Sequence, residues 1–153
     1  MNNSAWELEE RHTILELWTS AVTKAPDTVF VHFLDGDKQH TYAQFDQLTN
    51  RLAHGLLAAG VAQGDRIATL LDNHVDSVAL FIAASKVNAI YVPVNTANKG
   101  EFLRNPLANS GAKFLVAEDK YLGRVDAIRA SLPELVNIYV RGDTASTGTS
   151  VKG

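Results

Sequence analysis

Hydrophobic and polar positions alternate in blocks that predict helix, strand, helix and strand between residues 41 and 95. The first block carries a stripe of apolar residues at helical spacing that we expect to face inward, namely Phe45, Leu48, Leu52, Leu56 and Leu57. The run RIATLL is continuously apolar, which is typical of a short strand buried on both faces. The next inward stripe consists of Val75, Val78, Ala79 and Ile82, and the strand AIYVPV follows it. This order predicts parallel strands joined by right-handed crossovers.

The ends of these two helices carry recognisable signals. Thr41 and Gln44 have the spacing of a capping box at the first helix start. Gly60 ends that helix, and Val61 is placed to make the apolar contact that accompanies a Schellman motif. Asn88 ends the second helix, because asparagine tolerates the left-handed conformation better than most residues.

The segment before this block predicts a helix and a hairpin. A docking helix is indicated by a single stripe of apolar residues, namely Ile14, Leu17, Trp18, Ala21 and Val22. The runs VFVHFL and KQHT then read as two strands of a hairpin. The turn between them brings His32 and His40 near one another in this interpretation. Without cysteine or acidic residues at ligand spacing, we expect no metal site at this pair.

The segment after the block predicts one interrupted helix and one regular helix. Phe102, Leu103 and Leu107 have helical spacing, but Pro106 predicts a kink or a broken turn at residues 104–105. After the strand KFLVA, Asp119 is expected to cap a helix that packs on the sheet through Tyr121, Val125, Ile128 and Leu132. NIYV supplies the last strand.

These elements define the predicted fold and its boundaries. We expect an α/β fold with a mostly parallel sheet and helices on both faces, preceded by an N-terminal helix and a hairpin. Residues 1–12 are expected to be flexible, residues 13–140 to form a partial α/β domain, and residues 141–153 to be a linker or disordered tail.

Composition excludes several classes of protein. The chain has 153 residues, no cysteine and a formal net charge of -3, which leaves no disulfide framework and no basic footprint for nucleic acid. No apolar run reaches the ~20 residues of a membrane span, and the acidic N-terminus does not resemble a signal peptide. A reducing cytoplasm is therefore the expected location.

The polar residues at the carboxyl ends of the strands are the candidate site. In open α/β sheets ligands gather at this edge, which here carries Asn95, Thr96, Lys120 and, one turn into the next helix, Arg124. The alternative is that Lys120 and Arg124 are solvated surface charges. Asp72 also follows a strand, but we interpret it and Asp119 as caps of the following helices and not as acceptors of a phosphoryl group.

Several motifs in one register resemble those of the adenylate-forming superfamily, which includes acyl-CoA synthetases, peptide-synthetase adenylation domains and luciferases. TYAQF resembles the first core motif, LTYxEL, and KVNAIYVPVN is similar to the second, KAGAxYVPLN. GVAQGDRIATLLDN is close to GVxKGDRVAxLLxN, and residues 95–116 resemble the continuation in carnitine- and crotonobetaine-type CoA ligases. The likeness covers roughly residues 26–143.

The resemblance implies the N-terminal segment of an ATP-dependent acyl-CoA ligase, an enzyme of fatty acid metabolism that makes an acyl-AMP from a carboxylate and MgATP and then an acyl-CoA. It implies that the phosphate loop, the magnesium ligand and the mobile-domain lysine lie beyond Gly153. Residues 146–153 look like such a loop but follow the wrong element, so we interpret them as linker. No catalytic residue is then expected in this chain, which alone should be inactive and should bind neither ATP nor CoA tightly.

In some CoA ligases that resemble this chain, the matching loop touches CoA and a basic residue near the position of Arg124 pairs with the nucleotide phosphate. The resemblance therefore implies candidate CoA contacts at Asn95, Thr96, Lys120 and Arg124. The expected partner is the remainder of the parent chain, and the isolated chain is expected to self-associate through apolar surface. Two alternatives stay open: a fragment of a peptide-synthetase adenylation domain or luciferase-like enzyme, and a free-standing noncatalytic α/β binding module.

Overall fold

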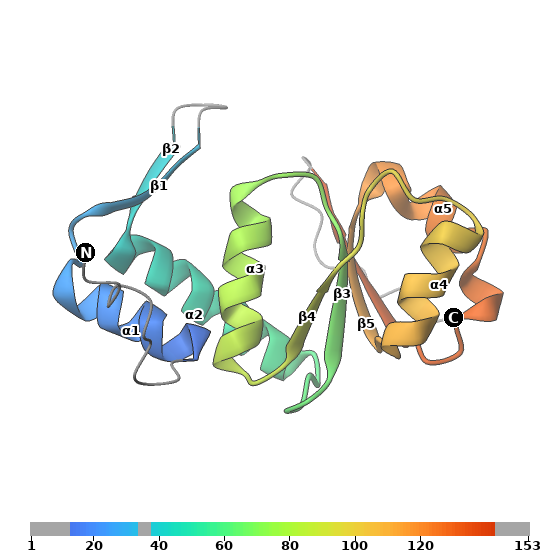
Figure 1. The fold of residues 1–153 in the computed structure, drawn as a ribbon, viewed down its shortest axis with the longest axis horizontal. Coiled ribbons are helices and arrows are strands. Elements are labelled where there is room, and N and C mark those ends of the chain that lie inside the picture. The colour runs from blue at the N-terminus through green and yellow to red at the C-terminus, as the bar shows by residue number, and fades with distance from the viewer. Residues whose placement is uncertain (1–12, 34–37, 143–153) are drawn as a thin grey trace, which may run out of the picture.

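A computed structural model of the chain describes residues 13–33 and 38–142. The expected flexible start and most of the expected tail lie outside these residues. A parallel sheet forms the centre, with the N-terminal elements on one side and the C-terminal helices on the other (Figure 1). None of the helices in the described part of the chain combines the length and apolarity that a bilayer crossing requires.

The N-terminal elements are a helix, a hairpin and a long second helix. Their bounds are α1 Ile14–Lys24, β1 Val29–Phe33, β2 Lys38–Thr41 and α2 Tyr42–Ala58. The strands β1 and β2 pair antiparallel, which confirms the expected hairpin. The capping box at Thr41 and Gln44 is present, with hydrogen bonds of 3.3 and 3.0 Å.

Trp18 fixes α1 to the rest of the molecule. Its ring is buried among Phe30, Tyr42 and Phe45, and its indole N–H donates to the carboxylate of Asp46 at 2.7 Å. Burial of the predicted apolar stripe is confirmed at Trp18 but is wrong for the residues on the far side of the helix. Ile14 and Leu17 are about half exposed, because they lie away from α2 and the hairpin.

The four parallel strands pair in the order β4-β3-β5-β6. Their bounds are β3 Arg66–Leu70, β4 Ile90–Pro93, β5 Phe114–Glu118 and β6 Asn137–Arg141. The connecting helices are α3 Val75–Lys86, α4 Glu101–Ser110 and α5 Leu122–Asp126, with short 3₁₀ turns η1 Asp119–Tyr121 and η2 Arg129–Ser131 beside α5. The expected α/β fold is confirmed.

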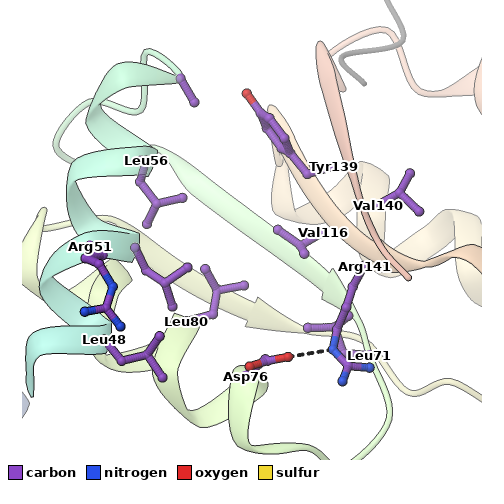
Figure 2. Close-up of a pocket in the computed structure, with 13 residues that line it drawn as sticks. Leu48, Arg51, Leu56, Leu71, Asp76, Leu80, Val116, Tyr139, Val140 and Arg141 are labelled. Atoms are coloured by element: carbon purple, nitrogen blue, oxygen red, sulfur yellow. Dashed lines mark hydrogen bonds and ion pairs between the residues drawn. The ribbon is translucent and has the colours of Figure 1, made fainter. Parts of the chain in front are cut away.

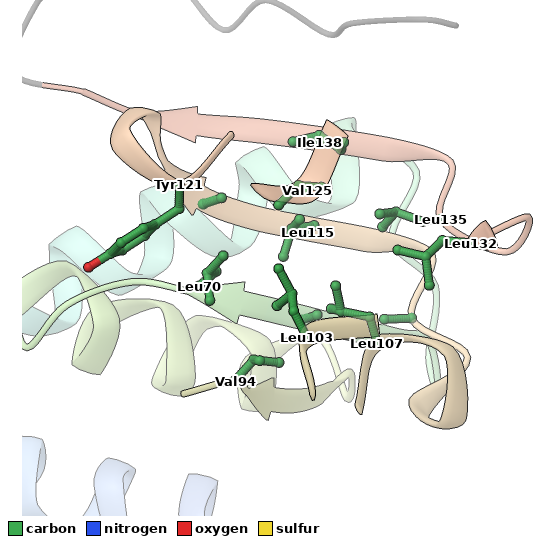
Figure 3. Close-up of a cluster of buried hydrophobic side chains, with 13 residues drawn as sticks. Leu70, Val94, Leu103, Leu107, Leu115, Tyr121, Val125, Leu132, Leu135 and Ile138 are labelled. Carbon is green, nitrogen blue, oxygen red and sulfur yellow. The ribbon is translucent and has the colours of Figure 1, made fainter. Parts of the chain in front are cut away.

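Side chains alternate between the two faces of the sheet. On the face covered by α4 and α5, one apolar core joins strand residues to Leu103, Leu107, Val125 and other side chains of the covering segments (Figure 3). On the other face, Ile67 and Phe114 pack with residues of α2 and α3. Successive side chains of β3 and β5 point to opposite faces of the sheet, so each strand contributes to two separate hydrophobic cores.

The two helix ends predicted from sequence are Schellman motifs. Gly60 has a φ of 86°, and the Val61 N–H donates to the Leu56 carbonyl at 3.0 Å. Asn88 has a φ of 55°, as expected for the left-handed cap. The chain therefore turns into β3 and β4 where the sequence indicated.

The structure corrects four expectations about helices. Leu57 and Val78 were expected inward, but 54% of Leu57 and 40% of Val78 is exposed. Pro106 lies inside α4, which runs without a broken turn because burial of the flanking leucines outweighs one missing bond. The single helix expected after Asp119 is divided into η1, α5 and η2, although the residues that face the sheet are the expected ones.

Candidate functional site

The carboxyl ends of the four parallel strands lie along one edge of the sheet. Asp72 follows β3, Thr96 follows β4, and Glu118 and Arg141 are the last residues of β5 and β6. Because the strands are parallel and in register, residues that are far apart in sequence meet here. This edge is where ligands bind in open α/β sheets.

Asp72 is the centre of the first half of this edge. It forms an ion pair with Lys120, and its other oxygen accepts a 2.6 Å hydrogen bond from the hydroxyl of Tyr121. The hydrogen bonds from Lys120 and Tyr121 hold the pKa of Asp72 below its ordinary value. In the same way, Asp72 and Glu118 raise the pKa of Lys120, so this ammonium stays charged.

Glu118 is a buried carboxylate that connects three strand ends. It accepts hydrogen bonds from the Asp72 backbone N–H at 3.0 Å and from Arg141 at 3.4 Å, and it lies 2.9 Å from Lys120. Arg141 also donates to Asp76 of α3 at 2.7 Å. A buried charge is tolerated only where such partners surround it, so Glu118 fixes the relative position of β3, β5 and β6.

Arg124 is placed differently from the other cations of this edge. Its Nη1 donates to the carbonyl oxygen of Thr96 at 2.6 Å, and its guanidinium lies 4.8 Å from the ring centroid of Tyr121. No carboxylate among the described residues forms an ion pair with it. Its charge and its remaining N–H groups are therefore available to bind an anionic ligand, whereas the ammonium group of Lys120 is already paired with Asp72 and Glu118.

The structure brings together only part of the candidate set from the sequence. Thr96 and Arg124 are in contact, whereas Lys120 is directed to Asp72 and Glu118. Asn95 is exposed and forms a local turn, in which its side-chain oxygen accepts the N–H of Ala97 at 2.8 Å. Asn95 and Thr96 line a surface hollow beside Asp72, with a volume of about 690 Å³.

The interpretation of Asp72 and Asp119 as helix caps is wrong. His74 is the N-cap of α3, and its ring nitrogen accepts the N–H of Asp76 at 3.1 Å. Asp119 begins η1, and its carboxylate accepts the adjacent N–H of Lys120. Both aspartates follow a strand at cap-like spacing, but α3 begins later than Asp72 indicated, and Asp119 is itself the first residue of η1.

Three important residues of this edge were missed from the sequence. The strand predicted over KFLVA stops one residue before Glu118, the predicted tail begins at Arg141, and the predicted role of Tyr121 is only in the core, whereas all three contribute polar contacts to this edge. One signal was available for Glu118, since a charged residue that continues an apolar strand needs a cation nearby and Lys120 follows two positions later.

The described residues contain no group of three or more histidine, cysteine or acidic residues that could hold a metal ion. The histidines of the hairpin do not converge. His40 lies opposite Val31, so His32 projects from the other face of the hairpin.

Comparison with known proteins identifies the family. The family model described as AMP-binding enzyme matches residues 18–152. The chain belongs to this family. The match begins inside α1 and continues past β6, so all of the described fold except residues 13–17 lies within it.

Relatives and solved structures agree with this assignment. The chain is 33% identical over 146 residues to long-chain-fatty-acid–CoA ligase FadD13 of Mycobacterium tuberculosis, covering 94% of the chain and 27% of the relative. It is 33% identical over 130 residues to a medium/long-chain-fatty-acid–CoA and 3-oxocholest-4-en-26-oate–CoA ligase of Mycobacterium marinum, covering 85% and 23%. The crystal structure of the N-terminal domain of FACL13 from Mycobacterium tuberculosis superimposes with a TM-score of 0.77 at 31% identity, covering 82% and 32%.

The chain therefore spans about a quarter of the length of these AMP-binding relatives. It corresponds to the N-terminal region of fatty-acid CoA ligases, as the match to the isolated N-terminal domain indicates.

Proposed function

We propose that this chain is the N-terminal part of an ATP-dependent acyl-CoA ligase that makes an acyl-AMP from a carboxylate and then transfers the acyl group to CoA. The observation that carries the proposal is the family match across residues 18–152, together with relatives named as fatty-acid CoA ligases. ATP, magnesium and CoA are then requirements of the parent enzyme, which we place in the cytoplasm.

The role of this chain in the parent is to build a rigid layer beside the reaction site. Glu118 and its partners lock three strand ends together, and the core between the sheet and α4 fixes the loop after β4. Fixed positions of this kind are what substrate orientation requires. We assign the catalytic groups and the magnesium ligands to the rest of the parent enzyme.

Within this layer, Arg124 is our candidate for the contact with CoA. A phosphate of the CoA nucleotide would accept charge-assisted hydrogen bonds from its guanidinium, which the Thr96 carbonyl and the Tyr121 ring hold in place. Lys120 is a weaker candidate than the sequence indicated, since two carboxylates already surround its ammonium group. Asn95 and Thr96 would border the ligand in the hollow beside Asp72.

Kinetics of the parent enzyme test this proposal. Arg124→Ala should raise KM for CoA by about tenfold or more, because one charge-assisted hydrogen bond contributes roughly 1.5–3 kcal/mol. Exchange of pyrophosphate into ATP, which precedes CoA binding, should be unchanged. The matched control is Arg104→Ala, which removes a partly exposed arginine paired with Glu101 on α4. An equal KM for CoA in both variants would contradict the CoA contact, and a parent that forms no acyl-CoA would contradict the function.

A further inference from the structure

Tyr121 and Arg124 lie three residues apart where η1 passes into α5. Residues at this spacing lie on the same side of a helical segment, and the Arg124 guanidinium is accordingly 4.8 Å from the centroid of the Tyr121 ring. The ring belongs to the apolar core on the α4 side of the sheet, and its hydroxyl points away from that core (Figure 3). The core therefore fixes the surface against which the guanidinium lies.

The hydroxyl of Tyr121 is anchored at the end of β3. It donates a 2.6 Å hydrogen bond to the carboxylate of Asp72. The backbone of Asp72 is itself held on both sides, because its N–H donates to Glu118 at 3.0 Å and its carbonyl accepts from the hydroxyl of Ser77 at 3.1 Å. A ring that is packed in the core at one end and bonded to a fixed carboxylate at the other cannot tilt freely.

The carbonyl of Thr96 supports Arg124 from a second segment. Nη1 of Arg124 donates to it at 2.6 Å. Thr96 lies in the turn that Asn95 closes by accepting the N–H of Ala97 at 2.8 Å, and Val94 before this turn is buried in the same core as Tyr121. Arg124 is therefore held between the loop after β4 and the segment after β5.

Both supports of Arg124 are uncharged, which distinguishes it from the other arginine of this edge. Arg141 donates to the carboxylate of Asp76 at 2.7 Å (Figure 2) and lies 3.4 Å from Glu118. An anion that binds Arg141 would compete with both carboxylates. A ring face and a carbonyl orient a guanidinium without neutralising it, so Arg124 is fixed in place and keeps its charge for a ligand.

Tyr121 acts on a ligand only through Arg124 in this arrangement. Its side chain is buried, with 9% exposed, and its hydroxyl is already bonded to Asp72. An arginine side chain is flexible, and ordering such a side chain at the moment of binding reduces affinity. A ring that orders the guanidinium beforehand removes part of this cost.

We propose that Tyr121 is a positioning residue for the CoA-dependent step: Asp72 fixes its hydroxyl, and its ring presents the Arg124 guanidinium to a phosphate of CoA. The inference rests on the proposed function, in which Arg124 contacts CoA, and adds that the hydroxyl of a buried tyrosine determines how well this contact forms. A positioning role predicts a change in KM for CoA without a change in adenylation, which precedes CoA binding.

Steady-state kinetics of the parent enzyme test the inference with two graded substitutions. Tyr121→Phe removes only the hydroxyl, whereas Tyr121→Leu also removes the ring. We expect KM for CoA to rise about threefold in the first variant and about tenfold in the second, because a flexible side chain loses its support in two steps. The kcat at saturating CoA and the exchange of pyrophosphate into ATP should not change.

A double-mutant cycle separates positioning from a general structural effect. In an enzyme that already carries Arg124→Ala, neither substitution of Tyr121 should raise KM for CoA further, because the side chain through which Tyr121 acts is absent. The matched control is Tyr91→Phe. The hydroxyl of Tyr91 accepts a 3.2 Å hydrogen bond from Thr69 on the opposite face of the sheet, so this variant loses a tyrosine hydroxyl without disturbing Arg124 and should keep the original KM for CoA.

Several results would overturn the inference. An unchanged KM for CoA in both Tyr121 variants, while Arg124→Ala raises it, would show that Arg124 needs no support from the ring. Additive effects in the double variants would mean that Tyr121 acts independently of Arg124. The same rise in KM in Tyr91→Phe, or a parallel loss of pyrophosphate exchange, would assign the effect to stability.

Failure of the proposed function gives a different pattern. If Arg124→Ala leaves KM for CoA unchanged, the CoA contact and this inference are both wrong. If the unsubstituted parent forms no acyl-CoA, the proposed function is contradicted before any variant is compared.

Discussion

The hydroxyl of Tyr121 donates a 2.6 Å hydrogen bond to Asp72, which joins the end of β3 to the segment after β5. The ring of Tyr121 is buried in the core shared with α4, and the guanidinium of Arg124 lies against it. A single side chain therefore connects the hydrophobic core, the ion pairs of the strand ends and the candidate CoA contact.

Removing this hydroxyl should destabilise the chain. Tyr121→Phe keeps the ring but leaves Asp72 without one donor, and a hydrogen bond to a charged group contributes roughly 1.5–3 kcal/mol. Because Asp72 is partly exposed and water replaces some of the loss, we expect a decrease in the free energy of unfolding that is smaller than this range. Urea denaturation measures it. Tyr42→Phe is the control, since no hydrogen bond of the Tyr42 hydroxyl is present among the described residues; equal midpoints for the two variants would contradict the prediction.

Acid should loosen the attachment of α1. Burial alone would raise the pKa of Asp46, but hydrogen bonds from Lys86, Trp18 and Asn50 outweigh it and hold the pKa below its ordinary value of 3.8. Because the pKa of Asp46 is lower in the folded state, ionised Asp46 stabilises the fold fully at any pH above its ordinary pKa. This stabilisation is lost as the pH falls through the pKa of the folded state. Fluorescence during urea unfolding at stepwise lower pH follows the loss, with Trp6 replaced by phenylalanine so that only Trp18 contributes. Asp46→Asn should lower the free energy of unfolding near neutral pH and should make that free energy fall less steeply as the pH is lowered. An unchanged pH dependence in this variant would show that Asp46 does not cause the loss of stability in acid.

Two glycine substitutions should have opposite signs. Gly55→Ala is expected to raise the free energy of unfolding by up to about 1 kcal/mol, because Gly55 is helical and its Cβ space is empty. Gly111→Ala is expected to lower it by about 1–2 kcal/mol, because Gly111 has a φ of 61°. The added Cβ would also lie 2.7 Å from the Arg66 guanidinium and displace it from the Ser110 carbonyl. Thermal and urea unfolding measure the change in the free energy of unfolding for each variant. A change in the same direction for both variants would contradict the prediction.

Pro106 should cost stability even though α4 is continuous. Pro106→Ala restores an N–H that can bond to the Phe102 carbonyl, which is worth up to roughly 3 kcal/mol in a helix interior. The freer unfolded chain offsets about 0.4–1 kcal/mol of this. We expect a net gain of about 2 kcal/mol in urea unfolding. A lowered midpoint would mean that proline is already accommodated in the native backbone.

Most of the fold was predictable because its signals are local. The capping box at Thr41, the Schellman glycine and the left-handed asparagine depend on neighbouring residues, and each is confirmed in the structure. The exposure of Leu57 and Val78 was not predictable, because it depends on how far each helix is covered by other elements. A helical stripe gives the direction of burial but not its width.

The site was less predictable because it depends on long-range contacts. Placing Lys120 and Arg124 at the strand ends required only the order of elements. That Lys120 turns toward Asp72, 48 residues away, while Arg124 contacts Thr96 follows from the strand order β4-β3-β5-β6. Sequence spacing contains no information about that order, so the two cations appeared equivalent.

Pyrophosphate exchange is the most direct test of the central claim, which is that this chain is a structural part of an acyl-CoA ligase without a complete active site. The parent enzyme and the 153-residue chain are each incubated with ATP, magnesium, labelled pyrophosphate and a panel of fatty acids. We predict fatty-acid-dependent exchange and acyl-CoA formation by the parent and none by the short chain. Robust exchange by the 153-residue chain, or no adenylation of any carboxylate by the parent, would contradict the account.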